Sequence, residues 1–119
     1  MGNQKQSTGV DMSEIFELQK QLRDFADTRD WAKFHSPRNL VLALGSEVGE
    51  LQGEVRWKTD EEIENADLDL RQRIANEMAD ISIFLLRLFD VLNLDFSDAV
   101  KKKIETNESR ALNGPDFSN

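Results

Sequence analysis

The sequence predicts an all-α fold built from four helices and short connecting segments. Apolar residues recur over long runs with the 3.6-residue period of an amphipathic helix. The 119 residues include only two prolines, six glycines and no tyrosine, a composition that favours helices over strands. This length suits one domain with a modest core. We expect the domain to span residues 11–113, between a disordered tail at 1–10 and a C-terminal tail at 114–119.

The composition excludes several classes of function. With 23 acidic and 15 basic residues the chain carries a net charge of −8, which argues against nucleic-acid or anionic-membrane binding. It has no cysteine, so disulfides and thiolate sites are excluded. The start of the chain is polar, and no segment approaches the ~18 apolar residues of a transmembrane helix. We therefore expect a cytoplasmic protein that binds neither nucleic acid nor membrane.

The first helix is expected to run from Asp11 to about Thr28. Asp11 and Glu14 resemble a capping box at its start. Its apolar stripe comprises Ile15, Leu18, Leu22 and Phe25. An aromatic-rich connection, RDWAKFHS, follows and contains the only histidine, His35.

The second helix is expected over residues 37–57, with Ser36 as N-cap and Pro37 at the first helical position. At ~100° per residue, its apolar stripe lies within about 80° of one direction. The stripe comprises Leu40, Leu44, Val48, Leu51 and Val55. Glu47, Glu54 and Glu50 fall on its other edge, at about −20°, −40° and −80° from Leu40. These carboxylates border the core-facing stripe, whereas an ordinary solvated face would lie opposite it.

The third helix is expected to start near Leu68, after an acidic linker at 58–67 that shows no periodicity. Glu77 and Asp80 fall at about −20° and −80° from Leu70, the phases of Glu47 and Glu50 in the preceding helix. Packing the two faces together would therefore gather four carboxylates. Each like-charged pair ~5 Å apart would cost on the order of 3 kcal/mol at an effective dielectric near 20. A divalent cation removes this cost, and oxygen ligands suit magnesium or manganese.

The end of the third helix predicts association, because ISIFLLRLFDVL is apolar nearly all round. After a turn, Ser97 is expected to cap a fourth helix that runs towards Asn113. On this helix Lys103, Asn107 and Arg110 lie within ~60° of one another. Two cations and an amide beside a carboxylate site would suit a triphosphate and its magnesium.

Each of these features also has a simpler interpretation. A single Glu-x-x-Glu is usually a solvated face, and only its repetition beside a core stripe favours a metal site. His35 could cap or pack, Trp31 and Trp57 could anchor helix ends, and the cations of the fourth helix could be solvated. Glu54 could pair with a cation in the next turn. Di-iron chemistry is set aside because it needs Glu-x-x-His pairs, and His35 is in neither acidic motif.

Three segments together resemble the MazG-like all-α nucleoside triphosphate pyrophosphohydrolases, most closely their small dCTP-pyrophosphatase-like branch. The segments are RDWAKFHSPRNLVLALGSEVGELQGEVRWKT, NEMADISIFLLRL and KKKIETNESR. The resemblance implies a MazG-like helical bundle that hydrolyses a (deoxy)nucleoside triphosphate to the monophosphate and pyrophosphate, a housecleaning activity on the nucleotide pool. It also implies a homo-oligomer, a dimer or a homotetramer built as a dimer of dimers.

The resemblance assigns site residues by position. Glu47, Glu50, Glu77 and Asp80 match the family's magnesium-binding E-x-x-E and E-x-x-D. Lys103, Asn107 and Arg110 match its K-x-x-x-N-x-x-R segment near the phosphates. Trp31, His35 and Trp57 match positions that hold the base and sugar, and Phe84 stands where relatives often have tyrosine.

Three positions depart from the family pattern. Ser46 replaces the first of two adjacent acids, as in the smaller branch, and Ala111 replaces a final aromatic. Leu22 stands where dCTP-specific relatives place a histidine, so cytosine specificity is not carried over.

The leading hypothesis is therefore a Mg²⁺-dependent dNTP pyrophosphohydrolase, with Mn²⁺ as a possible substitute. Glu47 or Glu50 would take the proton of the attacking water, and the sequence does not choose between them. The alternative is a non-catalytic helical oligomer that binds nucleotides or a partner protein.

Overall fold

The computed structural model describes residues 12–113 and confirms the all-α fold. Its elements are α1 (Met12–Thr28), the 3₁₀ turn η1 (Ala32–Phe34), α2 (Pro37–Val55), α3 (Asp60–Glu64), α4 (Leu68–Val91) and α5 (Phe96–Asn113). Within this range there is no strand, and no helix is long and apolar enough to cross a membrane. The two predicted tails and the predicted cap Asp11 lie outside the described residues.

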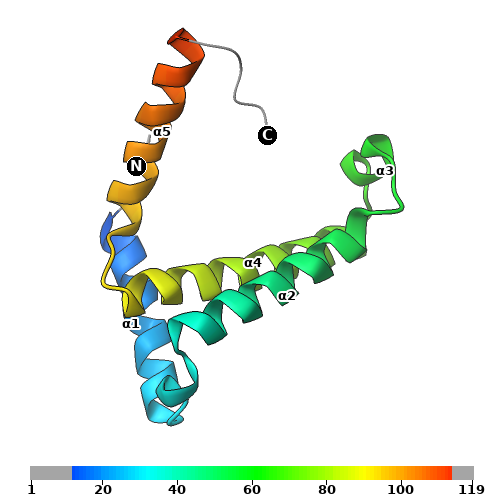
Figure 1. Cartoon of the computed structure of the whole chain (residues 1–119). Helices are drawn as coiled ribbons and strands as arrows, with labels where there is room; N and C mark the ends of the chain where they lie inside the picture. The colour runs from blue at the N-terminus through cyan, green and yellow to red at the C-terminus, as the bar shows by residue number, and fades with distance from the viewer. Residues whose placement is uncertain (1–11, 114–119) are drawn as a thin grey trace, which may run out of the picture.

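Helices α2 and α4 lie side by side and antiparallel (Figure 1). The predicted start of α2 is confirmed, because the Ser36 hydroxyl accepts from the Asn39 N–H at 3.1 Å and Pro37 opens the helix. Asp67 caps α4 by accepting from the Leu70 N–H at 2.9 Å. Leu40 and Leu70 are buried where the two helices pack. The caps and apolar stripes thus fix which faces of α2 and α4 meet.

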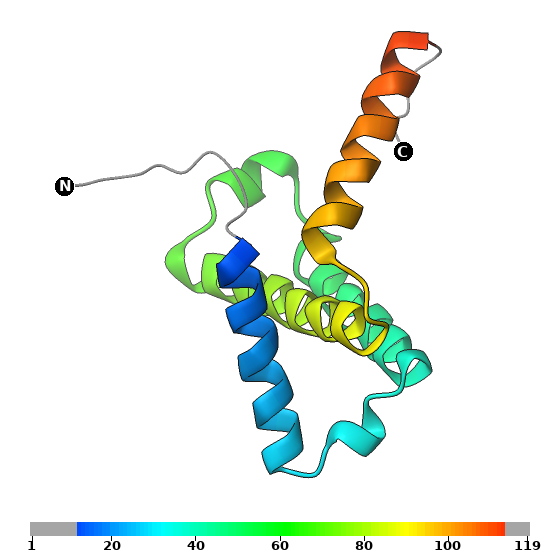
Figure 2. The same cartoon turned by 90° about the vertical axis from the view of Figure 1, so that its left-hand side faces the viewer.

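Helix α1 crosses α4 near the C-terminal end of α4 (Figure 2). Its buried residues are Ala26 and Gln19, and the Gln19 amide donates to the Leu86 carbonyl at 3.1 Å. The prediction that Ile15, Leu18, Leu22 and Phe25 form the core-facing stripe of α1 was therefore only half right. Leu18 and Phe25 are exposed because the face of α1 that meets α4 is rotated away from them.

The predicted irregular linker at 58–67 contains a short helix, α3, and this prediction was wrong. Thr59 and Glu62 form a capping box: the Thr59 hydroxyl accepts from the Glu62 N–H, and the Glu62 carboxylate accepts from the Thr59 N–H. A five-residue helix spans too little sequence to show periodicity. The α2–α3–α4 segment is consequently a hairpin with an ordered tip.

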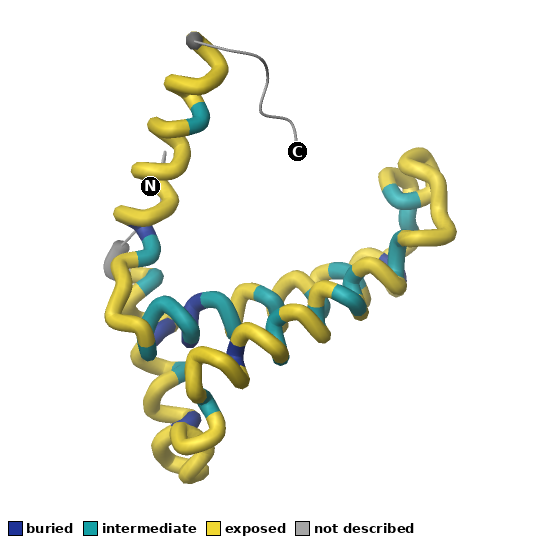
Figure 3. The backbone as a smooth tube through the Cα atoms, in the orientation of Figure 1, coloured by how far each residue is buried: buried dark blue, intermediate teal, exposed yellow. Residues whose placement is uncertain are grey.

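Helix α5 projects away from the hairpin formed by α2, α3 and α4, and is exposed along almost all of its length (Figures 1 and 3). It begins after a turn at Asn93, which adopts φ = 58°. The predicted cap Ser97 was wrong: the Asp95 carboxylate accepts from the Asp98 N–H at 2.8 Å, while Ser97 is buried. Asp95 occupies the capping position because the helix starts at Phe96, one residue before the expected cap.

Candidate functional site

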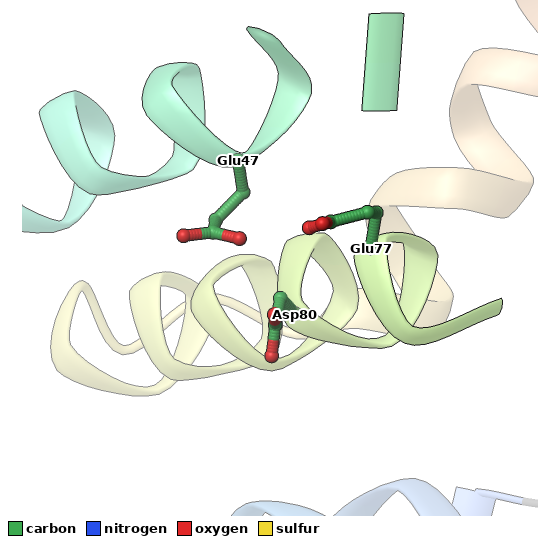
Figure 4. A group of neighbouring side chains, drawn as sticks. All are labelled: Glu47, Glu77 and Asp80. Atoms are coloured by element: carbon green, nitrogen blue, oxygen red, sulfur yellow. The ribbon is translucent and has the colours of Figure 1, made fainter. Parts of the chain in front are cut away.

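Three of the four predicted carboxylates meet between α2 and α4. One carboxylate oxygen each of Glu47, Glu77 and Asp80 lies within 4.8 Å of the others. Figure 4 shows Glu47 extending from α2 towards α4, where Glu77 points back to it and Asp80 follows one turn along the helix. The positions of Glu77 and Asp80, three apart, place both on one face of α4. We call these three residues the acidic cluster.

The acidic cluster is electrostatically strained without a cation. Burial, and then the negative charges of Glu50, Asp80 and Glu77, raise the pKa of Glu47 above its usual range. Burial, and then the charges of Glu50 and Asp80, also raise the pKa of Glu77. Moreover, Glu77 Oε1 is buried and has no hydrogen-bond partner among the described residues. A buried oxygen without a donor is costly, so the cluster would be stabilised by a ligand that supplies positive charge.

The donor set fits a divalent cation that prefers oxygen. All three groups are carboxylates and none of the three residues is fully buried, so water could complete the coordination. Magnesium and manganese accept such ligands, whereas zinc and copper favour nitrogen or sulfur.

Glu50 and Glu54 lie beside the acidic cluster and differ in their surroundings. Glu50 is exposed and lies outside the group within 4.8 Å, although its charge acts on both Glu47 and Glu77. Glu54 accepts from Arg73 Nε at 3.1 Å, and Arg73 also pairs with Asp69. Glu54 therefore links α2 to α4, which agrees with the simpler interpretation of a paired carboxylate, although its partner is Arg73.

An apolar cavity of about 450 Å³ is lined in part by α4, the helix that carries Glu77 and Asp80. Its lining residues come from α1, the η1 region and α4: Gln21, Leu22, Phe25, Ala26, Trp31, His35, Ile83, Phe84 and Arg87. The structure thus brings together three of the predicted base-binding residues, Trp31, His35 and Phe84. Phe84 follows Asp80 by four residues, about one helical turn. Helix α4 therefore contributes residues both to the cavity and to the acidic cluster.

A chain of polar contacts, which sequence reasoning missed, supports this cavity. Arg87 Nε donates to His35 Nδ1 at 3.1 Å, and Arg87 Nη1 donates to Asp90 at 3.2 Å. Asp90 also accepts two bonds from Arg23 of α1, both at 3.0 Å. Burial and the Arg87 charge lower the pKa of His35, so its ring is neutral at neutral pH. The spacing of Arg87 and Asp90, three apart on α4, was the only signal available in the sequence.

Comparison with known proteins shows which proteins this chain resembles. No family model matches the chain. It is 45% identical to bovine (Bos taurus) dCTP pyrophosphatase 1 and 43% identical to the human (Homo sapiens) protein, each over 89 residues, or 73% of this chain. These residues make up 53% and 52% of those proteins, so the chain spans about half the length of the curated relatives it matches.

A solved structure decides the relationship. A crystal structure of a pyrophosphatase from Archaeoglobus fulgidus is 34% identical and superposes with a TM-score of 0.71, covering 89% of this chain and 97% of that one. The chain belongs to the MazG-like family of dCTP-pyrophosphatase-like proteins. The family predicted from the sequence motifs is thereby confirmed.

Besides Glu50, four predicted site residues of this MazG-like chain join neither the cavity nor the acidic cluster among the described residues. Trp57 is 88% exposed just beyond α2, where it anchors no core. Lys103 and Arg110 are exposed on α5, and Asn107 is half-buried there. Because α5 leads away from the α2–α4 pair (Figure 2), the periodicity that aligned these three residues could not place them relative to the acidic cluster.

Proposed function

We propose that this MazG-like protein is a magnesium-dependent nucleoside triphosphate pyrophosphohydrolase acting on deoxynucleotides. It would cleave between the α- and β-phosphates and release the monophosphate and pyrophosphate. The observation that carries the proposal is the convergence of Glu47, Glu77 and Asp80 beside an aromatic-lined cavity. The names of the relatives, dCTP pyrophosphatase 1 and pyrophosphatase, support the same chemistry.

The placement of cluster and cavity suits one extended nucleotide. On α4, Glu77, Asp80, Phe84 and Arg87 lie within ~80° of one another, because the helix turns ~100° per residue. At ~1.5 Å rise per residue, Phe84 lies about 6 Å along the axis from Asp80 and about 10 Å from Glu77. The base would occupy the cavity beside Trp31, His35 and Phe84, and the phosphates would extend towards the carboxylates.

The chain's own carboxylates would organise the reaction. Glu47, Glu50, Glu77 and Asp80 would hold magnesium, with manganese as a substitute. When bound, the metal neutralises phosphate charge and lowers the pKa of coordinated water. Glu47 or Glu50 would take the proton of the attacking water. The apolar lining of the cavity would exclude water from the base.

The phosphate-binding role of Lys103, Asn107 and Arg110 is proposed to operate between subunits. These residues lie on α5, which leads away from the acidic cluster of its own chain. In a homo-oligomer, a dimer or a dimer of dimers, α5 of one copy would lie over the acidic cluster of another. Trp57 would reach a cavity in the same way.

The test measures pyrophosphate release from a panel of dNTPs with and without magnesium. We expect equimolar monophosphate and pyrophosphate only when magnesium is present, and loss of activity in Asp80→Asn. The matched control is Glu64→Gln on α3, which removes an exposed carboxylate far along the hairpin and should leave turnover unchanged. Nucleotide binding without turnover would instead support the non-catalytic alternative.

A further inference from the structure

The cavity lies between α4 and one continuous segment, α1 followed by η1. This α1–η1 segment contributes Gln21, Leu22, Phe25, Ala26, Trp31 and His35 to the lining. Asp30, with φ = 58°, turns the chain between its two parts (Figure 2). The Trp31 N–H donates to the Ala26 carbonyl at 2.8 Å, and the Phe25 and Trp31 rings meet edge to face at 5.5 Å. Contacts within the segment therefore hold its two parts together.

The α1–η1 segment makes little apolar contact with α4. Its only described buried residues are Gln19 and Ala26. Phe25 and Trp31, which line the cavity, are 47% and 46% exposed. Apolar stabilisation is proportional to the area removed from water, so this packing holds the segment only weakly. The position of the segment on α4 therefore depends strongly on polar contacts.

Two polar contacts, one before and one after the turn at Asp30, converge on a single pair of α4 residues. Arg23 of α1 donates through Nε and Nη2 to the two carboxylate oxygens of Asp90, each at 3.0 Å. His35, which follows η1, accepts at Nδ1 from Arg87 Nε at 3.1 Å. Arg87 Nη1 in turn donates to Asp90 at 3.2 Å. We call Arg23, Asp90, Arg87 and His35 the clasp.

The centre of the clasp is shielded from water. The side chains of Arg87 and Asp90 are 7% and 20% exposed. Charge-assisted hydrogen bonds are stronger than neutral ones, and shielding strengthens them further. Asp90 accepts from both arginines, so its carboxylate connects α1 to the residue that holds His35.

The acidic cluster does not depend on the clasp. Its three carboxylates lie on α2 and α4. These two helices pack through Leu40 and Leu70, and Arg73 of α4 donates to Glu54 of α2 at 3.1 Å. Loosening the clasp should therefore change the cavity and leave the carboxylates in place.

We propose that Asp90 is a positioning residue for nucleotide binding: through Arg23 and Arg87 it holds the α1–η1 segment against α4 and keeps the cavity ready for the nucleoside. Asp90 does not itself line the cavity. The inference rests on the proposed function, which places the nucleoside there. A preformed cavity binds more tightly, because binding does not have to order its wall. When the clasp opens, the apparent affinity falls with the fraction of molecules whose wall is closed.

The kinetic signature is a rise in KM without a fall in kcat. Asp90→Asn keeps the size of the side chain but removes its charge and one acceptor, which weakens the bonds to both arginines. KM for the best dNTP of the panel should rise by roughly tenfold, as expected if about one molecule in ten keeps the wall closed. At saturating nucleotide, kcat should stay within about twofold of wild type, because the chemical step is untouched. Calorimetry should show the corresponding monophosphate binding more weakly by a similar factor.

The single histidine reports on the clasp without metal or nucleotide. Burial and the Arg87 charge lower the pKa of His35. The bond from Arg87 to Nδ1 leaves the proton of the neutral ring on Nε2. In Asp90→Asn the looser wall should expose His35, so its pKa should rise towards the ordinary value of about 6.5 and its tautomers should become mixed. ¹⁵N NMR of tag-free protein measures both.

Asp24→Asn is the matched control. It makes the same substitution beside Arg23, at a carboxylate that pairs with Lys20 within α1 at 2.8 Å. KM, kcat and the His35 resonances should match the wild type. Arg23→Gln removes only the contact from α1, so it should raise KM less than Asp90→Asn does, and it carries the test if Asp90→Asn does not fold. Arg23→Lys, which keeps a charged donor, should lie between Arg23→Gln and wild type.

Three results would overturn the inference: a wild-type KM in both Asp90→Asn and Arg23→Gln, a loss of kcat as large as the loss of kcat/KM, or unchanged His35 resonances in Asp90→Asn. If the wild type hydrolyses no dNTP with magnesium, the proposed function fails. The His35 measurement and monophosphate binding then still test the clasp. Hydrolysis with an unchanged KM in the variants defeats only the positioning role of Asp90.

Discussion

Glu77 is the residue through which the acidic cluster is best tested, because its buried Oε1 has no hydrogen-bond partner among the described residues. We expect Glu77→Gln to raise the melting temperature of the metal-free protein, since it removes one negative charge from the cluster. The same change should abolish the rise in melting temperature that magnesium causes. It should also lower turnover by more than ~100-fold, because losing a direct metal ligand should cost more than the 10–100-fold typical of losing an outer-shell partner.

Thermal melts with EDTA and with magnesium, together with the dNTP assay, check this expectation. Glu64→Gln on exposed α3 serves as the control and should behave as wild type. A full magnesium shift in Glu77→Gln would place the metal elsewhere.

The raised pKa values of Glu47 and Glu77 predict how stability depends on pH. In the folded, metal-free protein these groups bind protons more tightly than in the unfolded chain, where their pKa is ordinary. The stabilisation this provides is complete below the ordinary glutamate pKa of about 4.3 and is lost as pH rises through the raised values. Magnesium competes with these protons, so its stabilising effect should grow over the same interval.

Melts at intervals from about pH 5 to about pH 7.5 test the sign, since this range lies above the ordinary glutamate pKa. The curves with EDTA and with magnesium should converge at the acidic end and separate as pH rises. A magnesium shift that stays constant across the range would contradict the assignment of these two carboxylates.

At the level of single residues, helical phase predicted the acidic cluster but not the contacts around it. Glu47, Glu77 and Asp80 meet because the turn per residue is fixed by the backbone, so sequence spacing alone gives the face. The Arg23–Asp90 pair joins residues 67 apart, and periodicity cannot say which partner a polar side chain will find. The cavity depends on such long-range contacts, which explains why the role of Arg87 was not predicted.

Among the elements, α2 offers a test of whether a second chain packs against its backbone. A Cβ added at Gly53 would have no heavy atom within 4 Å. We expect Gly53→Ala to raise the free energy of unfolding by about 1 kcal/mol, because glycine in a helix interior costs that much relative to alanine. Chemical denaturation measures it. Destabilisation instead would mean that another chain approaches the α2 backbone closely at this point.

The start of a helix was predictable where an N-cap residue is followed by proline and an apolar run, and not where a capping box stands without an apolar run. Ser36 followed by Pro37 gave the start of α2 correctly. Thr59 and Glu62 also have capping-box spacing, but no apolar run follows them, so the segment was interpreted as irregular. The placement of α5 lay beyond sequence reasoning, because its direction depends on the turn at Asn93, where φ is 58°.

For the whole molecule, the sparse core predicts a homo-oligomer. Only four apolar residues are buried in the described range: Ala26, Leu40, Leu70 and Leu86. Large apolar residues are exposed on every long helix, including Phe16, Leu42, Met78 and Ile104. These side chains are about half exposed, so covering each one should stabilise by about half of the roughly 1.5–3 kcal/mol that full burial contributes. We expect an oligomer at micromolar concentration by light scattering, with a melting temperature that rises with protein concentration.

Ile104→Asp on α5 should weaken this assembly. The control is Thr106→Asp, which adds the same charge on another face of the helix, where the residue is also exposed. A stable, active wild-type monomer would refute the expectation.

Mixing two inactive variants tests whether α5 serves the site of another copy. Glu77→Gln removes a cluster carboxylate, and Arg110→Ala removes a cation of α5. In a two-fold dimer whose sites combine both chains, random mixing should restore about a quarter of wild-type activity, because half the dimers are hybrids with one intact site each. The assay is run after subunit exchange. Activity that stays at the level of the separate variants would mean that each chain builds its site alone.

The α2–α3–α4 hairpin also has a consequence for the order in which the protein folds. Its two long helices are joined by residues 56–67 only, so closing the hairpin costs little chain entropy and can occur early. The Arg23–Asp90 pair spans 67 residues and should form later. The carboxylates that gather in the acidic cluster all lie on the hairpin. Magnesium that binds them during this early closure would accelerate folding itself, in addition to slowing unfolding.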